Sequence, residues 1–273
     1  MGRFQRGEPL GVLVFDCHAH MGRWTFPVFA EGSAEAMVAE MDRLGVDAVT
    51  VAHHACMAAS PRVGNGLAEK AIEPWPGRFF LYCGYSPHYP DEGPEELERA
   101  FADPRYVGIK LHPSTHETAI DDERYRPAFE FAHAHALPVL VHSWTGGGTR
   151  PELIGEAAAD FPDATVILGH HGGGWAGVEE AIDACKDHAN LVCDTCTSEL
   201  TYKIVDRLTD AIGADRVLFG SDLPFIAQGP QLGKVIYSRI SDEDKAKVLG
   251  GSFLSILKQR RNLPPLSLPA KTD

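Results

Sequence analysis

The stretch VLVFDCHAH, from Val12 to His20, joins an uninterrupted apolar run to two histidines that lie one residue apart. Short runs rich in β-branched and other apolar residues recur along the rest of the chain. Together with residues 12–16 they make eight candidate strands, the other seven being 47–52, 79–84, 107–111, 138–142, 164–169, 190–194 and 216–220. Continuous rather than alternating apolar runs are typical of a parallel sheet that is buried on both faces.

Stretches with the 3.6-residue period of amphipathic helices separate these runs, such as Ala34 to Leu44 before the helix-ending Gly45. Eight strand–helix units in 273 residues predict a single-domain (β/α)8 TIM barrel of the α/β class, spanning residues 1–273. An open, doubly wound sheet is the alternative, but the first run is not followed by Gly-x-Gly-x-x-Gly. We expect a final helix over Ser241 to Arg261 and an extended, proline-rich tail from about residue 262.

Charge and composition argue against several classes of partner. The formal net charge is -13 at pH 7, so we expect neither nucleic acid nor an anionic membrane surface as a main partner. No run reaches the roughly 18 to 20 apolar residues of a membrane span, and we find no secretory signal at the N-terminus. The six cysteines, including the Cys193-Asp-Thr-Cys196 pair, are expected to be reduced thiols of a cytoplasmic protein. A homodimer is left open as an assembly state.

Five of the eight candidate strands end in ionisable residues, which matters because a TIM barrel carries its chemistry at the C-terminal strand ends. Side chains alternate along a strand, so His18 and His20 should both face the barrel mouth, with Cys17 facing the helix layer. Imidazole and carboxylate groups are ligands of Zn²⁺ and related divalent ions, so their convergence predicts a metal site. The other strand-end groups are Lys110 and His112, His142, His170 and His171, and Asp222.

These motifs resemble the metal-dependent amidohydrolase superfamily, and within it the compact amidohydrolase-related branch that includes aminocarboxymuconate-semialdehyde decarboxylase. The resemblance rests on His18-x-His20, on LPVLVHSW around His142, on ILGHHGGG around His170 and on RVLFGSDLP around Asp222. It implies one divalent ion, Zn²⁺ in first place and Mn²⁺ as the alternative, held by His18, His20, His142 and Asp222. His170 and Asp222 would be the catalytic groups acting with a metal-activated water.

Lys110 has two alternative roles. In some branches of the superfamily a lysine at this position carries a carbamate that bridges two metals, and a second ion would then be held by His142 and His170. We favour one ion, with Lys110 contacting a substrate carboxylate. His170 is favoured over His171 as the catalytic member of the pair because it closes the strand.

Further residues around the barrel mouth are candidate substrate contacts. His112 follows the fourth strand, Arg23 the first and Trp144 the fifth. Arginine suits a carboxylate and tryptophan suits a flat ring.

Three functions compete at such a site. The leading prediction is a metal-dependent hydrolase of a small cyclic or acyl substrate. The alternative is a non-oxidative decarboxylase of an aromatic or muconate-like acid; relatives with that activity tend to be longer, so the compact chain favours hydrolysis. A catalytically silent metal-binding barrel is the third, and the complete set of water-activating residues argues against it.

Overall fold

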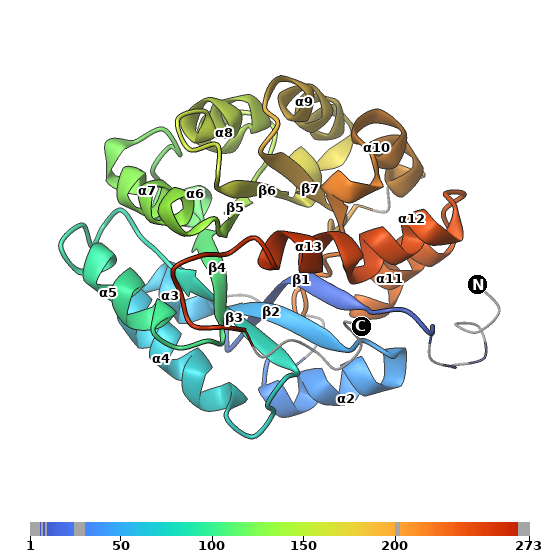
Figure 1. The fold of residues 1–273 in the computed structure, drawn as a ribbon, viewed down its shortest axis with the longest axis horizontal. Coiled ribbons are helices and arrows are strands. Elements are labelled where there is room, and N and C mark those ends of the chain that lie inside the picture. Colours follow the sequence, from blue (N-terminus) through green and yellow to red (C-terminus); the bar gives the residue numbers. More distant parts are fainter. Residues whose placement is uncertain (1–5, 7, 9, 25–30, 200–202, 267–273) are drawn as a thin grey trace.

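The structure is a computed structural model that describes residues 6, 8, 10–24, 31–199 and 203–266. Eight parallel strands follow one another around a single sheet in the order β1 to β8. The helices form a ring around this sheet (Figure 1). A parallel bridge between Ala19 and Leu223 and a hydrogen bond from the Cys17 amide to the Phe219 carbonyl join the two ends of the sheet. The predicted (β/α)8 barrel is therefore confirmed.

The strands lie where the apolar runs predicted them, with ends shifted by a few residues. They are β1 (Phe15–Met21), β2 (Ala48–His53), β3 (Phe79–Gly84), β4 (Tyr106–Leu111), β5 (Pro138–His142), β6 (Thr165–Gly169), β7 (Leu191–Asp194) and β8 (Val217–Leu218). The largest shift is in β1, which continues to Met21, so the two histidines lie within the strand and not beyond it.

Helices follow or precede each strand. They are α2 (Ala34–Leu44), α3 (His54–Ala58), α4 (Pro61–Ile72), α5 (Glu92–Phe101), α6 (Pro113–His116), α7 (Arg126–His135), α8 (Pro151–Ala158), α9 (Gly174–Asp187), α10 (Ile204–Ile212), α11 (Gln228–Ile236), α12 (Asp242–Ala246) and α13 (Ser252–Leu257). Helix α2 has the predicted bounds: the Ser33 hydroxyl caps its first turn, and Gly45 ends it with a left-handed φ of 74°.

The predicted C-terminal helix is interrupted. A π-helical turn, η5 (Lys247–Gly251), separates α12 from α13, and the helical segment ends at Leu257 rather than at Arg261. A Cβ on Gly250 would lie 2.9 Å from the Leu13 carbonyl oxygen and 3.0 Å from the Phe15 amide nitrogen, so a glycine here lets the turn lie close to the start of β1. Residues 262–266 of the predicted tail are not helical, and residues 267–273 lie outside the described part of the chain.

The core has two layers. Apolar side chains on one face of the strands, such as Val51, Leu81 and Val141, pack against the helices. Those on the other face fill the barrel, including Phe15, Tyr82 and Leu140. Phe253 and Leu257 of α13 pack in this second cluster, and α13 crosses one end of the barrel (Figure 1).

The prediction that Cys17 faces the helix layer is wrong. Its side chain belongs to the cluster that fills the barrel and not to the helix-facing cluster. The cause is a β-bulge. Asp16 pairs with Val49 and Ala19 with Val51, so both Cys17 and His18 stand opposite Thr50. The bulge turns Cys17 and His18 toward the same side of the sheet.

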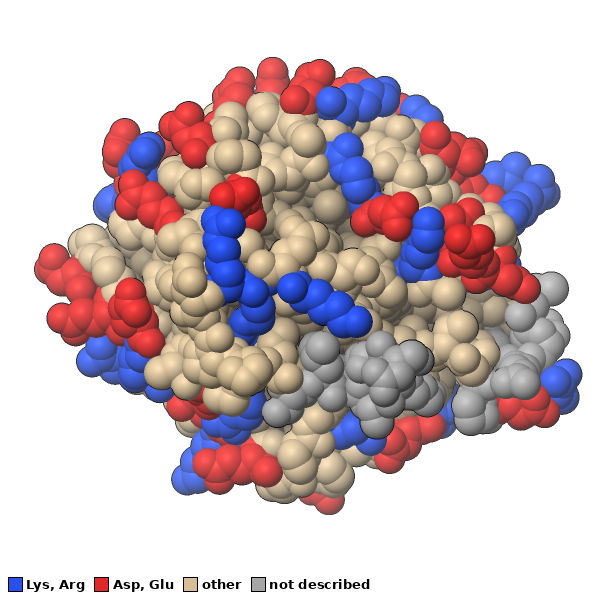
Figure 2. All heavy atoms as spheres, in the orientation of Figure 1, with Lys and Arg blue, Asp and Glu red and all other residues tan. Residues whose placement is uncertain are grey.

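The surface carries charges of both signs, and the cysteines are not paired in disulfides. Acidic and basic side chains are intermixed on the face drawn in Figure 2. Among the described residues, no helix combines the length and apolar character that crossing a membrane would require. All six cysteines are buried free thiols.

Candidate active site

Three predicted ligands meet at the C-terminal mouth of the barrel. The Asp222 Oδ1 atom lies 3.3 Å from His20 Nε2 and 3.7 Å from His18 Nε2. All three side chains are buried, and their donor atoms form one of two three-residue groups in the described chain with the spacing of a metal site.

The two histidines are oriented by their other ring nitrogens. His18 Nδ1 lies 2.6 Å from the Asp194 carboxylate, and His20 Nδ1 lies 3.3 Å from the Ala52 carbonyl oxygen. Because both partners only accept hydrogen bonds, a ring with its proton on Nδ1 satisfies each of them and leaves the Nε2 lone pair on the side of Asp222. This donor set fits a divalent cation.

Asp222 is held by a short polar turn after β8. Its backbone has a left-handed φ of 60°, and its amide donates to the His18 carbonyl at 2.8 Å. The neighbouring Ser221 donates to Asp16 through both its amide and its hydroxyl, and Gln228 of α11 donates to the same carboxylate. Asp16 therefore fixes the turn that carries Asp222 against β1.

His142, the fourth predicted ligand, lies beside this group. Its ring stacks on His112 with centroids 4.2 Å apart and meets the His170 ring at 4.8 Å. Its nitrogens are not part of the three-donor group with Asp222, so its coordination of an ion stays a prediction.

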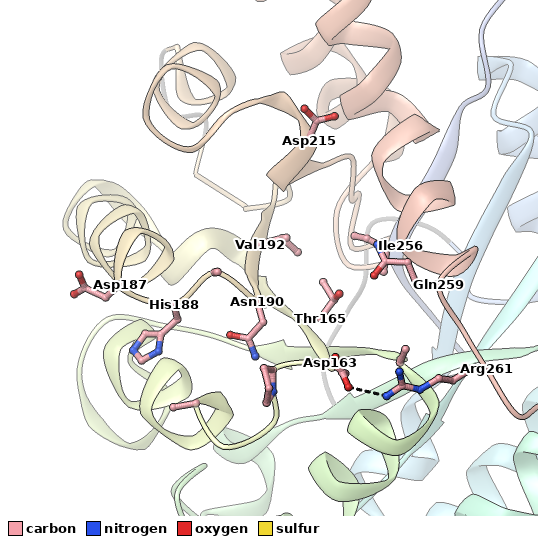
Figure 3. A pocket seen from close by; sticks show the side chains of 14 residues that line it. Asp163, Thr165, Asp187, His188, Asn190, Val192, Asp215, Ile256, Gln259 and Arg261 are labelled. Atoms are coloured by element: carbon pink, nitrogen blue, oxygen red, sulfur yellow. Dashed lines mark hydrogen bonds and ion pairs between the residues drawn. The ribbon is translucent and has the colours of Figure 1, made fainter.

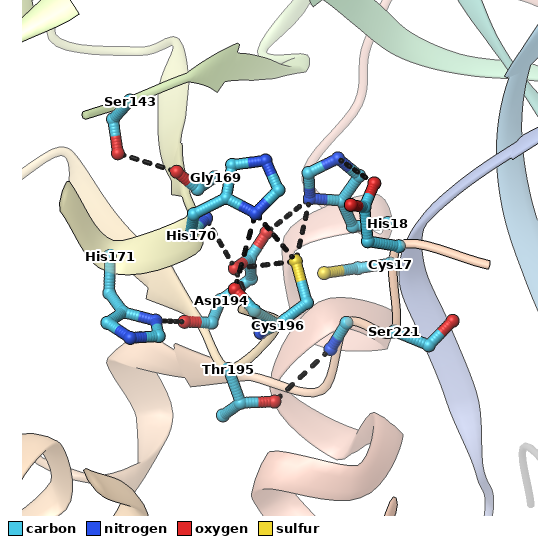
Figure 4. Close-up of polar contacts among 12 residues, drawn as sticks. Cys17, His18, Ser143, Gly169, His170, His171, Asp194, Thr195, Cys196 and Ser221 are labelled. Carbon is cyan, nitrogen blue, oxygen red and sulfur yellow. Dashed lines mark hydrogen bonds and ion pairs between the residues drawn. The ribbon is translucent and has the colours of Figure 1, made fainter. Parts of the chain in front are cut away.

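His170 and His171 follow β6 in a tight turn and point to opposite sides (Figure 4). Both have left-handed backbone angles, with φ of 67° and 42°. The His170 ring packs against His18 and lines the mouth cavity, whereas His171 Nδ1 bonds to the Asp194 carbonyl oxygen. The geometry agrees with the choice of His170, and its catalytic role stays a prediction.

A cavity of about 400 Å³ opens above the ligands. Its polar lining comes from His20, His112, His142, His170, Ser198 and Asp222. Its apolar walls are formed by Trp24, Met57, Trp144, Phe225 and Ile226. Of the four predicted substrate contacts, His112 and Trp144 line this cavity.

The other two predicted contacts lie elsewhere. Arg23 is exposed and is not among the cavity-lining residues. Lys110 is fully buried below the cavity, with its Nζ atom 3.3 Å from His18 Nε2. An ammonium there can donate to the His18 lone pair. Direct contact between Lys110 and a substrate stays a prediction.

Burial controls the protonation of the site. It lowers the pKa of His18, His20 and His142 well below the usual value for histidine, so these rings are neutral at pH 7. Burial also raises the pKa of the Asp222 carboxyl to about 6. Neutral imidazoles are the form that a metal ion requires.

Sequence reasoning missed two groups of site residues. Asp194 ends β7 as His142 ends β5, so the strand-end rule would have found it had we applied it to every strand. Cys196, two residues further on, contacts both His18 Nδ1 and His170 Nδ1. The second missed group is Phe225 and Ile226, which line the cavity. Their position in the loop after strand eight is the sequence signal that could have indicated them.

The second three-donor group consists of His18, His170 and Cys196. It uses His18 Nδ1, which already donates to Asp194. Burial also raises the pKa of the Cys196 thiol well above its usual value, which disfavours the thiolate that a metal would need. The first group, which opens on the cavity, is the better metal site.

A larger cavity of about 650 Å³ lies at the opposite end of the barrel, around the starts of β6 and β7 (Figure 3). Its side chains are used in structural contacts: Arg261 pairs with Asp163, and the Asn190 amide donates to backbone carbonyls. This end of a TIM barrel serves stability, so we place the chemistry at the smaller cavity.

Comparison with known families decides the broader assignment. A family model described as Amidohydrolase matches residues 15–252. The chain belongs to the amidohydrolase family. The match runs from the first residue of β1 to the first residue of α13 and so includes the whole barrel.

The individual proteins that resemble the chain share less than a quarter of its residues in the alignments. Gamma-resorcylate decarboxylase from Polaromonas sp. is 23% identical over 281 residues, covering 85% of each chain. The crystal structure of 2,6-dihydroxybenzoate decarboxylase from Rhizobium has a TM-score of 0.73 at 17% identity, covering 90% of this chain and 99% of that one. Manganese-bound 5-carboxyvanillate decarboxylase from Novosphingobium aromaticivorans has a TM-score of 0.72 at 14% identity, covering 91% and 96%. At these identities the structural likeness shows a shared fold.

Proposed function

We propose that this amidohydrolase is a metal-dependent, non-oxidative decarboxylase of a small aromatic carboxylic acid. One observation carries the proposal: His20 and Asp222, which form a three-donor group with the buried His18, line a cavity whose walls are largely flat rings. Such a cavity can hold an aromatic ring by stacking while its carboxylate meets the cation site.

The relatives favour decarboxylation over hydrolysis. The three named above are decarboxylases of aromatic acids. The alignments span 85% to 99% of their chains. The alternative from the sequence therefore becomes the proposal.

His18, His20 and Asp222 would hold one divalent ion, with His142 next to them as the fourth ligand. Manganese is our first choice, because it is bound in the 5-carboxyvanillate decarboxylase structure. The bound ion supplies positive charge that anchors an anionic substrate and stabilises charge that develops on it.

Decarboxylation replaces the bond from a ring carbon to the carboxylate with a bond to hydrogen, and CO₂ leaves. One proton must therefore reach the ring carbon. Asp222 lines the cavity, so its carboxylate lies where it can pass that proton to the ring. His170 lies on the same cavity and interacts electrostatically with Asp222, so it can pass a proton to that carboxylate.

The walls position the ring for this transfer. Trp144 lies nearly parallel to His142, at 7°, and Trp24 and Phe225, which also line the cavity, stand edge to face with each other. Their stacking excludes water from the ring carbon that takes the proton.

The test is a substrate panel with the Mn²⁺-loaded protein. We expect CO₂ release from hydroxybenzoates such as 2,6-dihydroxybenzoate, and loss of that activity in Asp222→Asn. Lactones and anilides in the same panel report hydrolysis. Ring opening without CO₂ release would refute decarboxylation and restore the hydrolase prediction.

A further inference from the structure

The Asp194 side chain makes four polar contacts below the mouth of the barrel (Figure 4). It is fully buried at the end of β7. Its Oδ2 atom lies 2.6 Å from His18 Nδ1. Its Oδ1 atom accepts the amides of His170 at 2.9 Å and of Cys196 at 3.2 Å, and the Cys196 thiol at 3.3 Å.

We propose that Asp194 is a positioning residue that sets His18 as a metal ligand and His170 as the acid–base residue through one carboxylate. The inference rests on the proposed function, because it takes His18 as a ligand and His170 as a catalyst. Asp194 itself does not line the cavity, so it acts through these two histidines.

The contact with His18 selects one tautomer. A carboxylate can only accept, so the proton of the neutral ring lies on Nδ1, and the lone pair lies on Nε2. The Nε2 atom faces Asp222 Oδ1 at 3.7 Å and Lys110 Nζ at 3.3 Å. With the other tautomer, a lone pair would face the Asp194 carboxylate and a proton would face the ammonium.

The two histidine ligands differ in this respect. His20 donates its Nδ1 proton to a neutral backbone carbonyl, at a longer distance of 3.3 Å. The charge of Asp194 makes His18 the more strongly donating ligand. A substitution at Asp194 can remove the partner of His18, whereas the partner of His20 is a backbone carbonyl that no side-chain substitution removes.

The contact with His170 acts on the backbone. His170 has a φ of 67°, a backbone conformation that residues other than glycine seldom adopt. The hydrogen bond from its amide to Asp194 helps to hold this turn. The same turn brings the His170 ring to 4.9 Å from the His18 ring, between their centroids. One carboxylate thus fixes the relative position of both groups.

The Cys196 thiol provides a matched control. It is buried next to Asp194 and also contacts His18 Nδ1, at 3.2 Å, and it contacts the His170 ring at Nδ1, at 3.4 Å, where Asp194 accepts the His170 backbone amide. It is a much weaker hydrogen-bonding partner than a carboxylate. Cys196→Ser changes the same pocket while leaving the Asp194–His18 bond in place.

The experiment measures Mn²⁺ affinity by calorimetry and the His18 ring nitrogens by ¹H–¹⁵N spectroscopy of the metal-free protein. Asp194→Asn should weaken Mn²⁺ binding by about 10- to 100-fold, the usual effect of losing such a partner. Cys196→Ser should stay within about threefold of the wild type. The wild-type His18 ring, assigned with His18→Gln, should carry its proton on Nδ1.

Each outcome decides something. Equal Mn²⁺ affinity in Asp194→Asn and wild type, or a proton on His18 Nε2 in the wild type, would overturn the role of Asp194. A wild type that binds no Mn²⁺ would refute the proposed function instead, and the ring spectrum would still decide the orientation of His18. If Asp194→Asn does not fold, the same spectrum of the wild type provides the test.

Discussion

Protonation of Asp222 should set the pH dependence of metal binding. Burial raises the pKa of this carboxyl to about 6 in the metal-free protein, whereas burial lowers the pKa of His18, His20 and His142 far below 6.5. An ion needs the carboxylate and the neutral rings. Binding should therefore release close to one proton at pH 5, about half a proton at pH 6 and almost none above pH 7, and that proton should come from Asp222.

The magnitude follows from that single group. Below its pKa, each pH unit costs about 1.4 kcal/mol, or a factor of about ten. The Kd for Mn²⁺ should thus be about tenfold higher at pH 5 than at pH 7 and nearly constant above pH 7. Three histidines with their ordinary pKa would instead produce a change of about 10⁴-fold over the same range.

Calorimetric titrations at pH 5, 6, 7 and 8 make the measurement, with proton release followed in two buffers of different ionisation enthalpy. In Asp222→Asn the affinity should be weaker and its dependence on pH should vanish. A change of several thousandfold, or release of two or more protons, would show that the histidines are charged in the free protein. A flat profile in the wild type would show that the Asp222 pKa is not raised.

The stability of the metal-free protein supplies an independent check with the opposite sign. The folded pKa of Asp222 lies above its unfolded value of 3.8, so the protonated carboxyl stabilises the fold at low pH. This contribution is present in full below about pH 4 and is lost as the pH rises through 6. Between pH 5 and pH 7 this loss is about 1 kcal/mol of the free energy of unfolding. Urea unfolding at several pH values should therefore show a free energy of unfolding that falls more steeply with pH in the wild type than in Asp222→Asn.

Three further predictions concern the other site residues. Changing His18 and His20 together to Ala should abolish the stoichiometric ion, measured by metal analysis, while circular dichroism stays that of a folded barrel; retained metal would refute the ligand assignment. His170→Asn should keep the ion and lower kcat by about 10²- to 10⁴-fold, with His171→Asn the milder change, and the reverse order in turnover assays would favour His171. The wild type and Lys110→Met should both bind one ion per chain. If instead the wild type binds two ions, Lys110→Met binds fewer, and bicarbonate raises the activity of the wild type alone, Lys110 carries the carbamate bridge.

The barrel was predictable from sequence because its signal is repeated eight times. Each strand is buried on both faces, so each reads as a continuous apolar run whatever its exact ends. The prediction of the final helix was less accurate. The helical periodicity continues through Gly250 and Gly251, so it does not reveal the π turn between α12 and α13. That turn depends on a close contact with β1, which is distant in sequence.

The site was predictable to the extent that residues end strands. This rule found His142, His170 and Asp222 without any knowledge of contacts. It could not find which loop side chains turn inward: Arg23 is exposed, while Phe225, a few residues after β8, forms part of the cavity wall. Loop direction depends on tertiary packing, which periodicity does not report.

The bulge in β1 links the fold to the chemistry. Alternation explains why His18 and His20 share a side, but it does not determine which side. In a regular strand whose Phe15 fills the barrel, position 18 would face the helices. The extra residue at Cys17 and His18 reverses the alternation. One strand can therefore supply Phe15 and Cys17 to the apolar interior and then both histidines to the mouth, which is why two ligands can come from β1.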